Sequence, residues 1–93
     1  MGLPWLYQLK GELLLMQRST TEAETCFRQA INIARAQNDR MRELSATTQL
    51  ARLLAKERRE QARSMLAEIY NWFTEGFETV DLREAKVLLD ELS

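Results

Sequence analysis

Side chains that commonly carry catalysis are scarce in this sequence. It contains no histidine, which removes the commonest general base and a frequent metal ligand. Its single cysteine, Cys26, stands beside Phe27 in an apolar pattern that predicts a buried, unreactive thiol. Gly11 is isolated inside a predicted helix, so no glycine-rich phosphate loop is present, and the carboxylates fall on polar helix faces. We therefore predict a protein that is not an enzyme and needs no metal or cofactor.

A basic group is the most conspicuous polar feature. Residues 28–63 carry nine basic and four acidic side chains, a net charge of +5, whereas residues 68–93 carry two basic and seven acidic ones, a net charge of −5. The basic group could meet an acidic partner or a phosphate backbone, or it could be a solvated face and turn that complements the negative C-terminal end of the third helix. Nucleic-acid binding is the alternative function, but the overall net charge of −1 does not favour it. The group consists of Arg52, Lys56, Arg58, Arg59 and Arg63.

Four aromatic residues, Trp5, Trp72, Phe73 and Phe77, could in principle enclose a ligand. Aromatic rings near helix ends more often pack against the core than enclose a ligand. We therefore predict that Trp72, Phe73 and Phe77 pack together at the connection after the fourth helix.

The composition predicts that helices position all of these residues. Hydrophobic residues make up 45% of the chain, with only three Gly and one Pro, and no segment alternates as a strand would. We predict an all-α fold in one domain, residues 1–93, built from about five helices. Its parts are a hairpin at 4–38, a hairpin at 40–74 and a capping helix at 80–92.

Apolar stripes at helical spacing define the inner face expected for each helix. In the first helix the stripe is Leu6, Leu9, Leu13 and Met16, widened by Tyr7 and Leu14. Gly11 in the middle of this helix suggests close approach of another backbone. For the later helices the inward residues are Ala23, Cys26, Phe27, Ala30, Ile33 and Ala34; Leu44, Thr47, Leu50, Ala51 and Leu54; Ala62, Met65, Leu66, Ile69, Tyr70 and Phe73; and Leu82, Ala85, Leu88, Leu89 and Leu92.

Capping residues mark the ends of the predicted helices. Ser19 or Thr21 could form a capping box with the glutamate three residues later, and Thr79 or Asp81 could begin the last helix. Asn38 can adopt the left-handed conformation that ends a helix, and Gly76 is a stop signal after the fourth helix.

The two hairpins are related as repeats. A shift of 40 places Gly11 on Ala51, and a shift of 39 places Phe27 on Leu66. An aromatic, a small and a large residue in the first helix, followed by Ala, an aromatic and Ala in the second, resemble the tetratricopeptide repeat. The repeat positions are Tyr7, Gly11, Ala23, Phe27, Ala30, Ala51, Ala62 and Leu66.

A closer resemblance covers most of the chain. The segments LKGELLL (9–15), AETCFRQAINIAR (23–35), LARLL (50–54) and WFTEGFETVDLREAKVLLDEL (72–92) are similar to the C-terminal tetratricopeptide tail of large bacterial signalling ATPases. Members of that family are often fused to an adenylate/guanylate cyclase or transcription-regulator domain. The resemblance implies a fragment of a longer protein that folds as an α-solenoid and acts as an interaction or scaffold module. Two departures are Arg18, where a turn glycine is expected, and Val80, where the family tends to have proline.

By this resemblance the first helix of each hairpin lines a concave face. The residues placed there, which would bind a protein, a peptide or a neighbouring domain, are Gln8, Glu12, Thr48, Arg52 and Lys56. If an earlier repeat precedes the first helix, that helix has an uncovered apolar side that includes Trp5 and Leu9, and homodimerisation could cover it. No apolar run is long enough for a membrane span, and the cytoplasm is the expected location.

Overall fold

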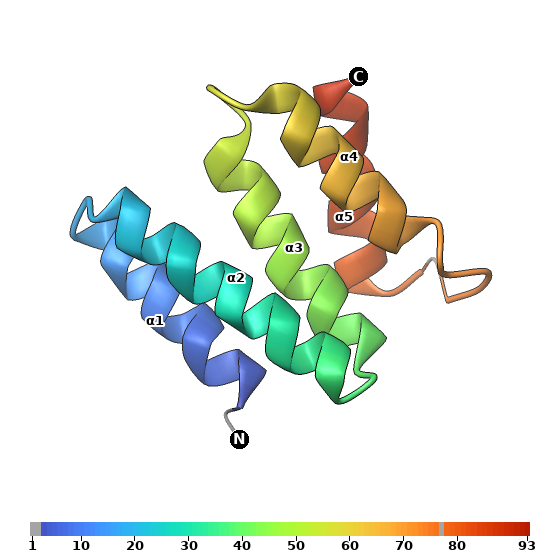
Figure 1. The fold of residues 1–93 in the computed structure, drawn as a ribbon. Coiled ribbons are helices and arrows are strands. Elements are labelled where there is room, and N and C mark those ends of the chain that lie inside the picture. The colour runs from blue at the N-terminus through green and yellow to red at the C-terminus, as the bar shows by residue number, and fades with distance from the viewer. Residues whose placement is uncertain (1–2, 77) are drawn as a thin grey trace.

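A computed structural model describes residues 3–76 and 78–93 of the chain. These residues form five α-helices and no strand (Figure 1). The prediction of an all-α fold is therefore confirmed. The helices are α1 (Pro4–Met16), α2 (Thr20–Ala36), α3 (Arg40–Leu54), α4 (Arg59–Tyr70) and α5 (Val80–Leu92).

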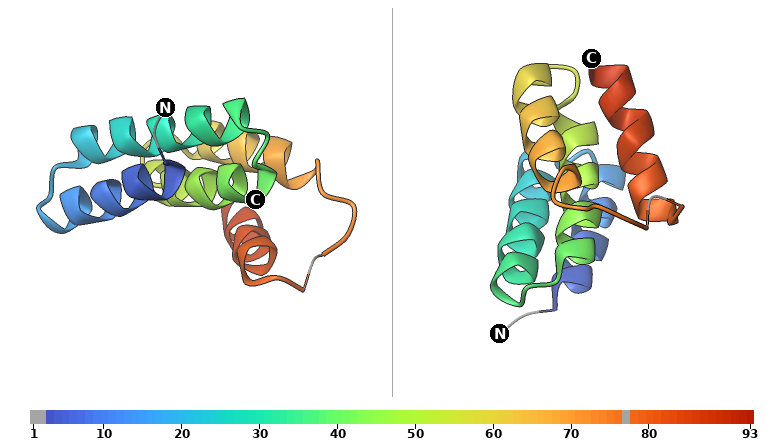
Figure 2. Two further views of the ribbon diagram at one scale, coloured as in Figure 1. Left: turned by 90° about the horizontal axis from the view of Figure 1, so that it is seen from below. Right: turned by 90° about the vertical axis from the view of Figure 1, so that its right-hand side faces the viewer.

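The helices pack in two layers. α2 and α4 lie in one layer, α1 and α3 lie in the other, and α5 crosses beside α3 (Figure 2). Each helix packs on the next along the chain, and α5 also packs on α3. The radius of gyration is 12.4 Å, close to the value of about 12 Å for a compact domain of this length.

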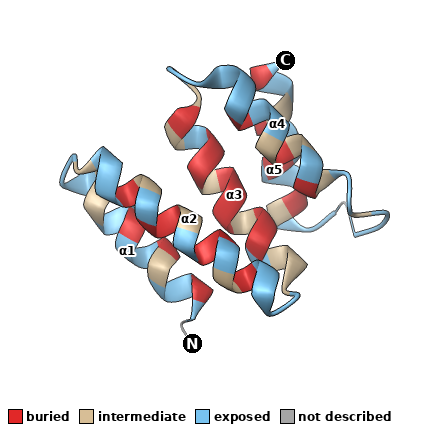
Figure 3. Ribbon diagram, viewed as in Figure 1, coloured by how far each residue is buried: buried red, intermediate tan, exposed pale blue. Residues whose placement is uncertain are grey.

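The core follows the predicted stripes of α2 to α5. Its largest fully buried side chains are Phe27, Leu44, Leu50, Leu66 and Leu82. Figure 3 shows α3 as the most continuously buried helix, because it has neighbours in both hairpins and in α5. Ile33, Met65, Tyr70, Phe73 and Leu89 are only partly buried, and the other residues predicted to point inward from these helices are buried.

The stripe predicted for α1 is wrong as an inner face. Leu6, Leu9 and Leu13 are about half exposed, and Met16 is 80% exposed. The buried residues of this helix are instead Pro4, Gln8 and Gly11. α1 is apolar around most of its circumference, so periodicity alone could not identify the face that packs on α2.

Gly11 determines which face of α1 packs on α2. A Cβ atom on Gly11 would lie 2.5 Å from Cε1 of Phe27, which is shorter than any tolerated contact. The close approach predicted for this glycine is therefore real, but its partner is an aromatic side chain of α2 and not a backbone.

The turns after α1 and α2 share one geometry. Arg18 and Asn38 both have positive φ, 63° and 57°. In each turn the next residue's N–H bonds the carbonyl five positions earlier: Ser19 to Leu14 at 2.8 Å, and Asp39 to Ala34 at 2.8 Å. These bonds form Schellman motifs, so Arg18 occupies the conformation usually taken by glycine and Asn38 ends α2 as predicted.

The helix N-termini show fewer capping hydrogen bonds than predicted. Ser19 is the N-cap of α2 and Thr79 that of α5, but neither side chain makes a capping hydrogen bond, so no capping box forms at Ser19. Asp39 does cap α3, where its carboxylate accepts from the Arg42 N–H at 3.1 Å.

The corner between α4 and α5 is only partly filled by aromatic rings. Trp72 meets Phe73 edge-on at 5.2 Å and is 56% exposed, and Phe77 lies outside the described residues. Gly76 has φ of 80° but follows the end of α4 at Tyr70 by several residues, so it shapes the connection and does not stop the helix.

Candidate functional site

An open cleft separates the two hairpins near the α1–α2 and α3–α4 turns. Its volume is about 640 Å³. Leu15 and Leu53 contribute half-buried apolar surface, and the polar lining comes from α1, α2, α3 and the α3–α4 turn. Its charged and amide lining residues are Glu12, Glu24, Gln49, Arg52, Lys56, Glu57 and Arg58.

Three of the five predicted partner-binding residues meet in this cleft. Glu12, Arg52 and Lys56 are exposed and line it. Arg52 also borders a shallower cleft of about 390 Å³ beside α5, where Val80 and Val87 are exposed. Arg52 therefore lines both the cleft between the hairpins and the cleft beside α5.

The other two predicted residues, Gln8 and Thr48, are buried and cannot bind a partner directly. The Gln8 amide nitrogen donates to Ser45 Oγ at 2.9 Å and to Gln49 Oε1 at 2.7 Å. Thr48 Oγ1 donates to the carbonyl of Leu44 at 2.8 Å. The repeat alignment placed both on the exposed concave face, whereas in the structure they make hydrogen bonds between or within packed helices.

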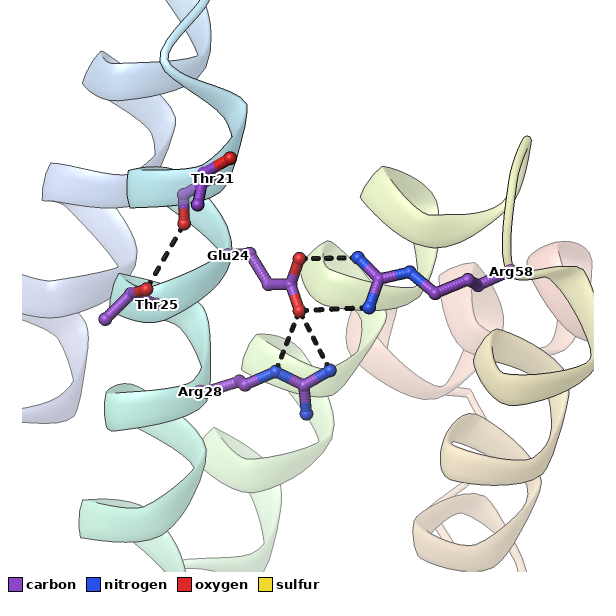
Figure 4. Close-up of polar contacts among 5 residues, drawn as sticks. All are labelled: Thr21, Glu24, Thr25, Arg28 and Arg58. Carbon is purple, nitrogen blue, oxygen red and sulfur yellow. Dashed lines mark hydrogen bonds and ion pairs between the residues drawn. The ribbon is translucent and has the colours of Figure 1, made fainter.

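An ion cluster joins the two hairpins at one side of the cleft (Figure 4). Oε1 of Glu24 lies 2.6 Å from Arg58 Nη2, and Oε2 lies 3.0 Å from Arg28 Nη2. The hydrogen bond from Arg58, with further help from Arg28, lowers the pKa of Glu24 below its usual value of 4.5 against a smaller opposing effect of burial. Glu24 is thus an ionised carboxylate that links α2 to the α3–α4 turn.

Most of the predicted basic group has internal partners. Arg58 binds Glu24, Arg63 lies 3.5 Å from Glu60, and Arg59 donates to the carbonyls of Glu91 and Leu92. Arg59 therefore complements the negative C-terminal end of α5, not that of α3 as the sequence suggested.

Arg52 and Lys56 are the least committed cations of the group. Arg52 lies 3.9 Å from Glu84, and both side chains are about half exposed, so this pair is weak. Among the described residues, Lys56 makes no hydrogen bond or ion pair. Arg52, in the last turn of α3, and Lys56, in the α3–α4 turn, both line the open cleft.

A second cleft of about 370 Å³, between α2, α3 and α4, was not predicted. Glu43 lies in it and is only 4% exposed. Its carboxylate accepts from Arg35 at 3.0 Å and from Arg40 at 2.9 Å, and the Arg40 guanidinium also lies 5.3 Å from the Trp72 ring centre. The prediction that carboxylates lie on solvated faces is wrong for Glu43, and only Arg40 three residues earlier hinted at its pairing.

Comparisons with protein-family models, curated proteins and solved structures give no match for this chain. The resemblance to tetratricopeptide tails therefore remains a prediction from the residues quoted above.

Groups suited to chemistry are sparse in the described part of the chain. No set of three or more His, Cys, Asp or Glu side chains there could hold a metal ion. Cys26 is buried and unpaired, as predicted. No helix in the described ranges is both long and apolar enough to cross a bilayer.

Proposed function

We propose that this chain is a non-catalytic protein–protein interaction module that receives an extended peptide in the cleft between its hairpins. The observation that carries the proposal is the pair Arg52 and Lys56, two exposed cations that line an open cleft at the C-terminal end of α3 and in the turn that follows it. A partner can bind charged side chains that have few internal contacts without breaking interactions that stabilise the fold.

The charge of the cleft favours a peptide with acidic side chains. The Glu12 carboxylate accepts from Gln49 at 2.7 Å, and Glu24 is bound by two arginines. Of the cleft's anions, Glu24 is therefore neutralised by arginines, Glu12 accepts from a neutral amide and Glu57 keeps its charge. Lys56 and the weakly paired Arg52 are the cations left to meet an acidic side chain of a peptide. Half-buried Leu15 and Leu53 would accept apolar side chains of the same peptide.

The wider role rests on the sequence resemblance. A tetratricopeptide-like α-solenoid at the C-terminal end of a bacterial signalling protein would act as a regulatory tail or scaffold, in the cytoplasm. Its partner would be another protein or a neighbouring domain of the same protein. The two-layer arrangement of paired helices supports this reading, since repeats of helix pairs present grooves to peptides.

Nucleic-acid binding is the weaker candidate. Arg58 and Arg59 are engaged with Glu24 and with the end of α5, so binding phosphates would require them to leave those contacts.

The proposal is tested by selecting binders from a random phage-displayed peptide library on the immobilised chain. We expect enrichment of peptides that combine acidic and apolar residues. Reversing both cleft charges, Arg52→Glu with Lys56→Glu, should weaken their binding at least about tenfold by fluorescence polarisation. The matched control, Arg42→Glu with Arg63→Glu, changes the net charge equally outside the cleft and should bind like the parent. Failure to enrich any peptide, or equal loss in both double variants, would overturn the proposal.

A further inference from the structure

α1 carries an apolar stripe that no other described element covers. It is the outermost helix of the first hairpin (Figure 1). The stripe consists of Trp5, Leu6, Leu9, Leu13 and Met16, with exposures of 45%, 46%, 49%, 52% and 80%, and Leu3 at its start is 49% exposed.

The N-terminal part of the equivalent face of α3 is covered. A shift of 40 places Trp5, Leu6 and Leu9 on Ser45, Ala46 and Gln49. Ala46 is fully buried, and Ser45 and Gln49 accept hydrogen bonds from Gln8 of α1. The N-terminal half of the α1 stripe therefore occupies positions at which the same kind of helix, one repeat later, packs against other helices. Leu13 and Met16 correspond to Leu53 and Lys56, which line the open cleft.

The exposed apolar area of the stripe is comparable with that of a protein interface. Large side chains that are half exposed present on the order of 100 Å² each, so the stripe offers several hundred Å² of apolar surface. The largest apolar patch on a typical monomer is about 300–600 Å², and a standard interface buries about 800 Å² on each partner.

The spacing of the stripe is self-complementary. Leu6, Leu9, Leu13 and Met16 are separated by three, four and three residues, so the series is the same when read backwards. Two antiparallel copies of α1 would place Leu6 beside Met16 of the other copy and Leu9 beside Leu13. A two-fold axis at the level of Gly11 relates these contacts, as a closed dimer requires.

We propose that this chain forms a homodimer through antiparallel packing of α1 on α1 of a second copy. The interface is the Leu6–Met16 stripe, with Trp5 and Leu3 at its ends. It is distinct from the peptide cleft, so either proposal can fail without the other.

The oligomeric state is measured by analytical ultracentrifugation from about 1 μM to about 1 mM. We expect a monomer–dimer equilibrium in this range. Leu9→Glu places a charge at the centre of the stripe and should give a monomer at all concentrations with unchanged circular dichroism. Val87→Glu, at a similarly exposed apolar residue of α5, should dimerise like the parent. A parent that is monomeric at 1 mM, or a Leu9→Glu variant that still dimerises, would overturn the proposal.

Cross-linking tests the orientation, in a Cys26→Ser background whose folding is checked first. In the antiparallel dimer the two copies of Lys10 are offset by two residues, about 3 Å along the helices, and those of Met16 by ten residues, about 15 Å. A short bis-maleimide should therefore link Lys10→Cys chains and leave Met16→Cys chains unlinked. Equal linking at both positions would indicate parallel helices, and linking at neither would remove α1 from the interface.

Discussion

Gly11 and Phe27 pack as one unit at the junction of α1 and α2. The ring of Phe27 is fully buried and occupies the space that a Cβ on Gly11 would need. In the second hairpin the equivalent residues are Ala51, which is larger than glycine, and Leu66, which is smaller than phenylalanine. The repeat alignment therefore pairs glycine with phenylalanine in the first hairpin and alanine with leucine in the second.

This compensation predicts the outcome of a double-mutant cycle. Gly11→Ala should destabilise the fold by about 1–2 kcal/mol, because overpacking against Phe27 outweighs the gain in helix propensity of about 1 kcal/mol. Combined with Phe27→Leu, which copies the second hairpin, the same alanine should become neutral or stabilising. Urea denaturation measures the cycle. An equal cost of Gly11→Ala in both backgrounds would show that the ring does not set the requirement for glycine.

Glu24 makes stability depend on pH. Its pKa is lowered in the folded state by Arg58 and Arg28. The ionised form is thus favoured by folding, and the resulting stabilisation is complete above the unfolded pKa, near 4.5, and is lost as the pH falls through the lower folded pKa.

Glu24→Gln should therefore lower the free energy of unfolding by about 1 kcal/mol at neutral pH, and the difference from the parent should shrink below pH 4.5. Glu68→Gln is the matched control, because Glu68 is exposed and makes no ion pair or hydrogen bond among the described residues. Urea unfolding at several pH values measures both. A Glu24→Gln deficit that stays constant down to pH 2 would contradict the assignment.

At the scale of elements, α5 is held at its C-terminal end by Arg59 from the start of α4. The guanidinium reaches the carbonyls of Glu91 and Leu92, which lack partners within the helix. The inner face of α5 consists of its buried apolar side chains, which are Leu82, Ala85, Leu88 and Leu92. The basic turn that the sequence presented as a candidate binding surface thus partly serves to dock the last helix.

Arg59→Gln should loosen this end alone. We expect a loss of stability of about 1 kcal/mol and faster amide exchange in the last turn of α5, with α1 and α2 unchanged. Arg63→Gln, which removes an exposed contact within α4, should leave exchange in α5 unaltered. Uniformly faster exchange along all helices would mean that Arg59 acts on the whole fold and not on the docking of α5.

The sequence predicted the helices better than it predicted their faces. Each of α2 to α5 has one apolar and one polar face, so its buried residues could be predicted from the helical spacing of its apolar residues. α1 has apolar residues on nearly every side, and its orientation depends on the fit between Gly11 and Phe27, a contact between residues 16 positions apart. Gln8, Thr48 and Glu43 were misplaced for a related reason: burial of a polar side chain depends on partners in other helices or turns.

At the scale of the whole molecule, the two hairpins and α5 leave two kinds of unused surface. The cleft between the hairpins offers Arg52 and Lys56, and the outer side of α1 offers an apolar stripe. We propose that the first binds a peptide with acidic side chains and that the second binds α1 of another copy. A module with both could gather two peptides on one dimer, which raises the effective affinity for a bivalent partner.

The most direct test of the interaction role is an NMR titration of the isotopically labelled chain with a peptide enriched in the selection described above. We predict that amide shifts change along the cleft, at Glu12, Gln49, Arg52 and Lys56, and that the Arg52→Glu, Lys56→Glu variant shows no such changes at the same peptide concentration. Shift changes confined to the α1 stripe or to the α2–α4 cleft around Glu43, or changes that persist in the variant, would contradict the account.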